Sequence, residues 1–383
     1  MEKRTGISIR PVSGAQDLKT FIRLPHAIYA DDPAWVPPLD IERKMHLSPR
    51  HNPFFNHGEA QLFIAYADSQ PVGRVSAHVN HLHLRTHGDD TGFFGFIEGM
   101  DDPAIFAALL EEAANWLRAH GMKRMRGPFS FSINEESGLL VQGFDTPPAF
   151  LMGHARQWYD AHVKAAGLEK VMDLYAYDFD DSARPHEKAT RLAGRLIDKG
   201  DLVIRRMNKK RLREELDIIM GIFNDAWSQN WGFIPFTAEE IRKLGDDLKF
   251  LIRERNVLIA EYRGEPAAMA VVMPDINRWI AGFRGRLLPF NWARFLYHLW
   301  FAGPPERMRM PLMGVRRKFH KGPLGAGIAI AVINQIWRDH AEWGVKSAEL
   351  SWVLETNHAV RNIIESLGGR HYKTYRIYEK AIA

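Results

Sequence analysis

The order of strand-like and helical segments repeats once along the chain, and this repeat limits the folds open to it. Alternating apolar runs bounded by turn residues predict the strands, and Pro103 and Gly121 bracket one of the predicted helices. In both halves the order is strand–helix–strand–strand–strand–helix–strand–helix–strand. The predicted strands are 7–12, 61–67, 72–80, 93–97, 122–131 and 171–179, then 202–207, 257–262, 267–273, 310–315, 347–355 and 372–380. The predicted helices include 103–120 and 149–166, then 212–227, 328–343 and 358–367. Identity between the halves is low, so the layout alone is duplicated.

The length of 383 residues suits two domains of about 150–200 residues each. We expect an N-terminal domain at 1–179, a linker at 180–201, where Pro185 and a charged stretch interrupt the pattern, and a C-terminal domain at 202–383. Within the second domain, 277–309 has no place in the repeated order and reads as an insertion.

Composition excludes several function classes. The chain is 46% hydrophobic and 25% charged, with 51 Lys and Arg against 46 Asp and Glu, a net charge of +5. This mild excess comes without a nucleic-acid-binding motif, so we expect no nucleic-acid partner. The absence of cysteine removes disulfides, thiolate metal sites and cysteine nucleophiles, and we expect a cytoplasmic protein without a metal. The polar N-terminus predicts no signal peptide, and no stretch approaches the ~20 apolar residues of a membrane span.

A basic, glycine-rich loop stands between strand 310–315 and the following long helix. Its residues are Arg316, Arg317, Lys318, Phe319, His320, Lys321, Gly322, Pro323, Leu324, Gly325, Ala326 and Gly327. Glycines let backbone N–H groups turn inward, the helix N-terminus adds partial positive charge, and the basic side chains surround the entrance. The pattern predicts a pyrophosphate site, and a basic turn without a ligand is the alternative.

The first half lacks such a loop. Its corresponding helix begins after Asp101 and Asp102. Carboxylates there stabilise a helix by roughly 0.3–1 kcal/mol each, and they would repel a pyrophosphate. We therefore expect the N-terminal domain to keep the fold without the cofactor site, as a scaffold or substrate wall.

From Met310 to Ala383 the chain resembles the CoA-binding half of the GNAT acyltransferase superfamily. Gly325 and Gly327 match the family's glycines, Gly322 replaces its usual Arg or Gln, and Asn357 matches its Asn before a helix that closes with glycine. The resemblance implies an α/β fold of tandem GNAT-like domains, each a twisted mixed sheet flanked by helices, with acyl-CoA as co-substrate. The expected CoA-binding residues are Val315, Arg317, Lys321, Gly322, Leu324, Gly325, Ala326, Gly327 and Asn357.

Acyl transfer to an amine needs a base, because deprotonating an alkyl amine of pKa about 10.4 at pH 7 costs about 4–5 kcal/mol. Alternation along 347–355 puts Glu349, Ser351 and Glu355 on one face, opposite Ala348, Leu350, Trp352 and Leu354. Either Glu349 or Glu355 could be the base, as could His320. By analogy with related enzymes, Tyr378 could protonate the leaving thiolate. The alternatives are a solvated or helix-capping Glu355, a solvent-facing or phosphate-binding His320, and a core Tyr378.

The segment 278–301 is basic, aromatic and apolar. Such a composition suits a helix in a membrane interface or over a lipid tail, where each buried CH₂ contributes about 0.8 kcal/mol. Trp279, Phe283 and Trp292 are its candidate lipid-binding residues. An ordinary buried helical hairpin is the alternative.

Motifs along nearly the whole chain resemble the bacterial ceramide synthase-like family, also called YghO-like. They occupy 32–39, 52–55, 92–96, 127–130 with 134–138, and 143–148. The resemblance implies acyl-CoA-dependent N-acylation of a sphingoid base, and Asn134, in the polar loop 134–138, could hold the substrate's amino-alcohol head. A structural turn is the alternative for that loop.

We therefore expect an N-acyltransferase with a long-chain acyl-CoA donor and a lipid amine acceptor, in the cytoplasm with peripheral contact at the inner membrane face. Two alternatives stay open: an acetyl-CoA-dependent N-acetyltransferase acting on a small or protein amine, and a non-catalytic protein that binds CoA or a membrane. A preference for long-chain over acetyl donors separates the first two, and CoA binding without turnover on any amine marks the third.

Overall fold

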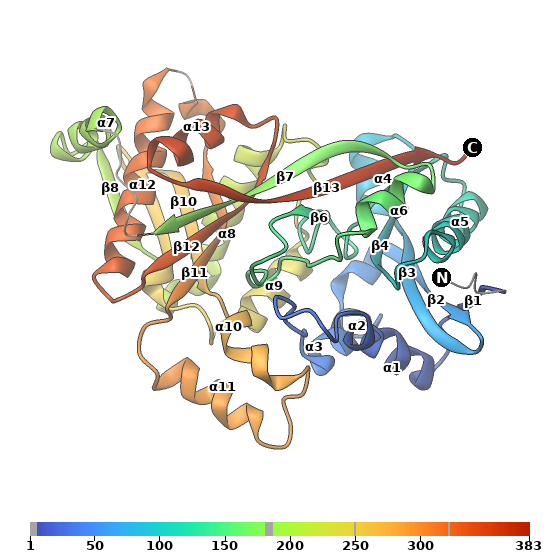
Figure 1. Ribbon diagram of the computed structural model, residues 1–383. Helices are drawn as coiled ribbons and strands as arrows, with labels where there is room; N and C mark the ends of the chain where they lie inside the picture. The colour runs from blue at the N-terminus through green and yellow to red at the C-terminus, as the bar shows by residue number, and fades with distance from the viewer. Residues whose placement is uncertain (1–5, 181–186, 249, 321) are drawn as a thin grey trace. The chain divides into compact units, whose positions relative to one another are not determined.

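A computed structural model describes residues 6–180, 187–248, 250–320 and 322–383 (Figure 1). The chain divides into two compact units. Unit 1 comprises Met1–Leu174, Asn277–Ala293 and Lys373–Ala383, and unit 2 comprises Tyr175–Ile276 and Arg294–Tyr372.

Unit 1 is a mixed sheet with helices packed against it. Its strands follow the order β1-β2-β3-β4-β5-β13-β7, and β6 pairs with β13. The strands are β1 (Ser8–Pro11), β2 (Gly58–Ala67), β3 (Gln70–Asn80), β4 (Thr91–Gly99), β5 (Arg124–Gly127) and β6 (Leu139–Gln142), with parts of β7 (Glu169–Asp180) and β13 (Arg370–Ala381). The helices are α1 (Ala15–Arg23), α2 (Pro25–Ile28), α3 (Asp40–His46), α4 (His81–His87), α5 (Pro103–Ala119), α6 (Tyr159–Ala165) and α10 (Asn277–Ile280), with 3₁₀ turns η1 (Pro53–Asn56) and η4 (Ala281–Phe283).

Unit 2 repeats this design. Its strands follow the order β7-β12-β11-β10-β9-β8. The strands are β8 (Leu202–Arg206), β9 (Val257–Tyr262), β10 (Glu265–Pro274), β11 (Arg307–Val315) and β12 (Ser347–Leu354). The helices are α7 (Glu187–Asp198), α8 (Leu212–Trp227), α9 (Ala238–Leu248), α12 (Pro323–Ala341) and α13 (His358–Ser366), with 3₁₀ turns η2 (Lys209–Arg211), η3 (Glu254–Asn256) and η5 (Arg317–Phe319). Helix α11 (Asn291–Trp300) begins in unit 1 and ends in unit 2.

The sheet of unit 2 carries a hydrophobic core on each face, because its strand residues alternate between the two. Ala268 and Ala270 of β10 pack with α12 and α7. Met269 and Val271 of the same strand pack with α8. Helices α12 and α8 therefore cover opposite faces of this sheet (Figure 1).

The predicted mixed α/β architecture is confirmed. Among the described residues, the second half has the six predicted strands, whereas the first half has one more than predicted, because β6 lies between β5 and α6. Helix 212–227 and strand 257–262 have the predicted bounds. The predicted helix 149–166 is helical only from Tyr159, because the preceding stretch follows two prolines and contains Gly153, and none of these residues favours a helix.

The compact units differ from the predicted domains. Residues 277–293 of the predicted insertion and 373–383 of the final strand belong to unit 1. The predicted linker 180–201 contains α7, whose Ala193 is buried in the core of unit 2. A strand that runs from one unit into the other leaves no boundary signal, since its residues keep the same alternation throughout. Pro185 lies outside the described residues.

Candidate active site

The neighbouring parallel strands β11 and β12 of unit 2 are paired over only part of their length. Their ladder runs from Arg307 opposite Ser347 to Met310 opposite Leu350, whereas β11 continues to Val315 and β12 to Leu354. Beyond this ladder Trp227, the last residue of α8, donates its indole N–H to the Met313 carbonyl at 3.3 Å. Strands that separate in this way expose backbone groups that a ligand can use.

Glu349 lies on β12 and is completely buried. Ser351 and Tyr372 donate hydroxyl hydrogen bonds to its two carboxylate oxygens, and Nε of Arg309 is 3.8 Å from Oε1. Arg309 also donates from Nε to the Ser351 hydroxyl at 3.0 Å. A buried carboxylate needs such partners, because burying an unpaired charge is costly.

Arg307 extends this network. It donates to the Tyr372 hydroxyl at 3.3 Å and to Oδ1 of Asp178 at 2.6 Å. Burial alone would lower the pKa of Arg307, but Tyr372, Asp178 and Glu349 outweigh burial and raise it. Tyr372 is half-buried, whereas Glu349 and Arg309 are buried.

The glycine-rich loop joins β11 to α12 on the same side of the β11–β12 ladder as the strands' free ends. Gly322 is the N-cap of α12 with φ of 71°, and it has no side chain to satisfy the first helical amides. A Cβ atom at Gly325 would lie 2.7 Å from the Phe319 carbonyl oxygen, so only glycine lets α12 begin this close to η5. Amides of a first helical turn lack partners within their helix, and they can bind a phosphate.

The basic residues of the loop differ in what they contact. Arg316 donates to the Pro266 carbonyl at 2.9 Å, and Lys318 pairs with Glu265. Arg317 is exposed, and its Nη1 lies 3.4 Å from the Ser228 hydroxyl. Lys321 lies outside the described residues. Arg317 is therefore the described loop cation with the weakest contact to the protein.

Three other predicted residues have structural contacts. His320 donates from Nε2 to the Val315 carbonyl at 2.7 Å, which closes the loop. Asn357 caps α13 by accepting a hydrogen bond from Val360 N at 3.2 Å. Glu355 is half-buried at the end of β12. The structure thus brings Glu349 together with Ser351 and Tyr372, while His320 and Asn357 brace the backbone around them.

The structure places other predicted residues in unit 1. Tyr378 is buried and donates to Asp160; burial and that carboxylate raise its pKa. Asn134 donates its backbone N–H to the Ser132 hydroxyl at 3.2 Å. Glu349 and the glycine-rich loop belong to unit 2, so Tyr378 and Asn134 are in the other unit.

Trp279, Phe283 and Trp292 also belong to unit 1. Phe283 is buried, whereas Trp292 is 47% exposed.

The N-cap of helix α5 in unit 1 is Asp102, whose carboxylate accepts a hydrogen bond from Ala104 N at 2.9 Å. A carboxylate therefore stands at the position of α5 that corresponds to the glycine loop of unit 2.

One predicted orientation is wrong. Alternation put Trp352 on the face of β12 opposite Glu349, but Val353 packs into the core with α12, and the Trp352 ring lies 5.8 Å from the Trp227 ring of α8. The regular alternation ends where the ladder with β11 ends, because the strand is no longer held in register there.

Sequence reasoning missed Arg309 and Tyr372 as partners of Glu349. Arg309 follows an apolar residue in a strand that reads as core, and only its register opposite Glu349 gives it a role. A charged residue inside an otherwise apolar strand is the signal that could have found it.

Among the described residues, no group of three or more His, Asp or Glu side chains is arranged to hold a metal ion. No described helix has the length and apolarity needed to cross a bilayer.

Comparison with known proteins gives two close relatives. "Protein YghO" of Escherichia coli (strain K12) is 42% identical over 376 residues, which cover 98% of this chain and 95% of that protein. "Bacterial ceramide synthase" of Caulobacter vibrioides (strain NA1000 / CB15N) is 44% identical over 378 residues, which cover 98% of both chains. No family model matches the chain.

A solved structure gives the fold. "Tandem GNAT protein from the clavulanic acid biosynthesis pathway (without AcCoA)" superposes with a TM-score of 0.56 at 13% identity, over 99% of both chains. The chain thus has the fold of a tandem GNAT protein, as predicted. With two relatives above 40% identity along nearly its whole length, the chain belongs to the bacterial ceramide synthase family, which includes protein YghO.

Proposed function

We propose that this N-acyltransferase transfers a long-chain acyl group from acyl-CoA to the amine of a sphingoid-base-like lipid. The observation that carries the proposal is the 44% identity, over 98% of both chains, to a protein named bacterial ceramide synthase. The GNAT fold accounts for a CoA thioester as donor and an amine as acceptor.

Unit 2 would bind the CoA. The first-turn amides of α12, at Leu324 and Gly325, would receive the pyrophosphate, with Ala326 in the next position of the helix and Arg317 supplying charge. Gly322 and Gly327 keep side chains out of this turn. Backbone groups of β11 up to Val315 would bind the pantetheine arm where the strands separate. We retain Lys321 in this set on sequence grounds, and Asn357 as the residue that fixes α13.

Glu349 is our proposed general base, acting through Tyr372. The half-buried Tyr372 hydroxyl would take the amine proton while its own proton passes to Glu349, to which it is already hydrogen-bonded. Arg309 and Arg307 would hold this pair in place. His320 is the weaker candidate, because its Nε2 already donates to a carbonyl. Glu355 remains a second carboxylate at the end of the strand.

The lipid part of the proposal rests on one exposed apolar segment. Leu288 is 69% exposed, Phe290 80%, Trp300 55% and Phe301 73%. Large aromatic and aliphatic side chains exposed together mark a lipid or protein contact. We propose that this segment brings the enzyme to the membrane surface, where a long-chain amine resides.

The test is a panel assay of CoA release. Purified protein is given acetyl-, octanoyl- and palmitoyl-CoA in turn, each with a sphingoid base, a short alkyl amine or a lysine peptide. The proposal predicts release only with the sphingoid base and the longer donors. Release that is fastest with acetyl-CoA and the peptide would favour an acetyltransferase. CoA binding without release on any amine would mean a non-catalytic protein.

A further inference from the structure

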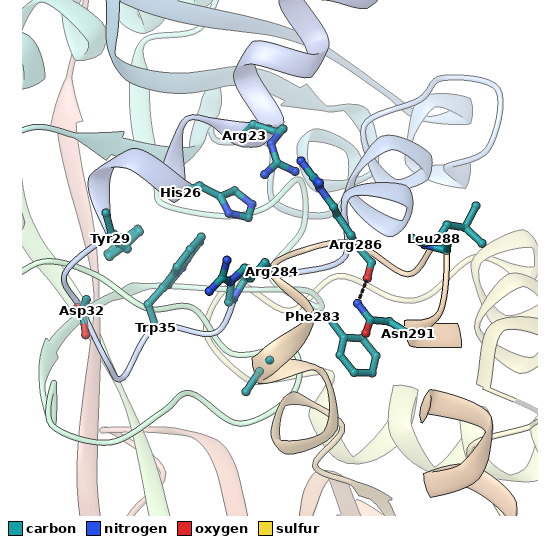
Figure 2. A pocket seen from close by; sticks show the side chains of 15 residues that line it. Arg23, His26, Tyr29, Asp32, Trp35, Phe283, Arg284, Arg286, Leu288 and Asn291 are labelled. Carbon is teal, nitrogen blue, oxygen red and sulfur yellow. Dashed lines mark hydrogen bonds between the residues drawn. The ribbon is translucent and has the colours of Figure 1, made fainter. Parts of the chain in front are cut away.

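A cavity of about 890 Å³ opens in unit 1 beside the exposed apolar segment. One wall comes from α1 and the stretch after it, and the other from the turn that precedes α11 (Figure 2). The lining residues used below are Arg23, His26, Asp32, Arg284, Arg286 and Leu288, together with Asn291.

The cavity is rich in positive charge. Arg23 pairs with Asp40, and Asp32 is bound by His154 at 3.0 Å, so these acidic groups already have partners. Within the described part of the chain, no carboxylate pairs with the guanidinium groups of Arg284 and Arg286, both of which are exposed. Two arginines without counter-ions on one turn form a site for an anion.

The position of these arginines is fixed by the turn between them. Gly285 has φ of 75°, and its carbonyl accepts from Asp40 N at 2.8 Å. A Cβ atom there would lie 2.7 Å from Oδ1 of Asp40 and 3.2 Å from the His26 ring. Only glycine fits, so the turn is held against the Arg23–Asp40 pair.

The neighbouring tip, 287–292, pairs several of its own backbone groups. Asn291 donates its side-chain amide to the Arg286 carbonyl at 2.7 Å (Figure 2), and the Trp292 indole donates to the Pro289 carbonyl at 2.8 Å. Trp292 N donates to the Leu287 carbonyl at 2.8 Å. Leu288 and Phe290 project from this closed turn. Such a tip can enter an apolar phase without leaving these backbone groups unpaired.

We propose that this cavity binds the phosphate head group of an anionic phospholipid in a bilayer, with Arg284 and Arg286 on the phosphate and the tip 287–292 in the acyl boundary. The inference rests on the proposed function in that a lipid amine requires the enzyme at a membrane. It adds the lipid class that recruits the enzyme and the residues that recognise it.

Charge also excludes the substrate amine from this cavity. A sphingoid base carries a positive head, which the guanidinium groups of Arg284 and Arg286 would repel. An anionic lipid complements both parts of this surface. Its phosphate matches the arginines, and its acyl chains match Leu288 and Phe290. A soluble phosphate would use only the first part.

The experiment is vesicle co-sedimentation of the full chain. Vesicles contain phosphatidylcholine alone or mixed with phosphatidylglycerol. The double variant Arg284→Gln/Arg286→Gln is compared with the matched control Arg50→Gln/Arg85→Gln, which removes the same charge from exposed arginines that do not line the cavity. We expect the cavity variant to bind mixed vesicles about twenty-five-fold more weakly than wild type, at about a factor of five per arginine. The control should change binding less than about threefold, because its arginines do not line the cavity.

Three results would overturn the inference. One is equal binding of wild type and cavity variant to mixed vesicles. Another is calorimetric saturation by sn-glycerol 1-phosphate at the concentrations of lipid that bind, since a free phosphate would then be the ligand. The third is a change of oligomeric state in the cavity variant without a change in vesicle binding, which would indicate contact between copies of the chain.

Turnover separates this inference from the proposed function. Acylation of a sphingoid base in neutral detergent micelles needs no anionic bilayer, so wild type and cavity variant should turn over equally there. Absence of turnover in both would contradict the proposed function. The vesicle result would then still test the proposed lipid site in the cavity.

Discussion

At the residue scale, the activity we propose depends on one buried carboxylate. Glu349 accepts hydrogen bonds from Ser351 and Tyr372 and has no exposed surface, so its proton must arrive through a neighbour. Replacing Glu349 by Gln keeps the shape and removes the base. We expect kcat to fall about 10²- to 10⁴-fold, with CoA affinity unchanged within about threefold, as measured by CoA release and calorimetry.

The matched control is Glu355→Gln, directly after the same strand, which should leave kcat within about threefold of wild type. Tyr372→Phe should lower kcat in the same direction as Glu349→Gln, and the double variant should be little worse than either single one, because the two groups act as a unit. Full activity of Glu349→Gln together with an inactive Glu355→Gln would show that Glu355, and not Glu349, is the base.

Two buried histidines give unit 1 a pH dependence. Burial lowers the pKa of His78 to about 3 and that of His83 to about 4, from the usual 6.5. Because the pKa values in the folded state are depressed, the stability that depends on these neutral histidines is fully present above pH 6.5. It is lost as the pH falls from there toward 4. At pH 5 each histidine lowers the free energy of unfolding by about 2 kcal/mol, because the unfolded chain binds a proton that the folded chain does not.

Urea unfolding at pH 7 and pH 5 measures this loss. His78→Phe should reduce the difference between the two pH values by about 2 kcal/mol, with His51→Gln, at an exposed position, as the control. A difference that is the same in wild type and His78→Phe would show that His78 is not held neutral.

At the element scale, the start of α12 determines whether the loop can take a diphosphate. A Cβ atom at Gly325 meets the Phe319 carbonyl, so Gly325→Ala must push the helix away from η5. We expect the affinity for CoA to fall roughly tenfold, at about 1.4 kcal/mol, by titration calorimetry. Gly194→Ala on α7, where a Cβ meets nothing within 4 Å, is the control. Unchanged affinity in Gly325→Ala would place the CoA elsewhere.

Local sequence signals predicted the elements well and their packing less well. Hydrophobic periodicity, with Pro at the start and Gly after the end, is enough to predict α5. A glycine-rich run between strand and helix is enough to predict the loop. The partners of Glu349 were not predictable, because Arg309 and Tyr372 reach it from other strands and only register brings them together. His320 and Asn357 have residue types that serve binding and bracing equally well, so sequence alone left both roles open.

At the scale of the whole molecule, the repeat predicted two domains, but their boundaries follow long-range pairing. The last strand, β13, pairs with β5 and β6 of unit 1, although its residues end the chain. The structure therefore predicts that truncation before Lys373 removes a strand from unit 1. Limited proteolysis should then digest Met1–Leu174 faster in the truncated chain than in the full one. Equal digestion would contradict this pairing.

The apolar tip belongs to this scale as well, since it concerns how the enzyme meets its substrates. Leu288→Ser/Phe290→Ser removes exposed apolar surface without touching the Glu349 network or the loop. We expect kcat/KM for vesicle-borne sphingoid base to fall about tenfold or more, while turnover in detergent micelles stays within about threefold. A loss of equal size in both media would place these residues in substrate binding.

The central claim is amide formation on a lipid amine. The most direct measurement incubates the purified enzyme with palmitoyl-CoA and a sphingoid base and quantifies free CoA and the N-acyl product by mass spectrometry of one reaction. The account predicts equal amounts of both, with far less product from acetyl-CoA at the same concentration. CoA release without amide, or no release with any donor, would contradict it.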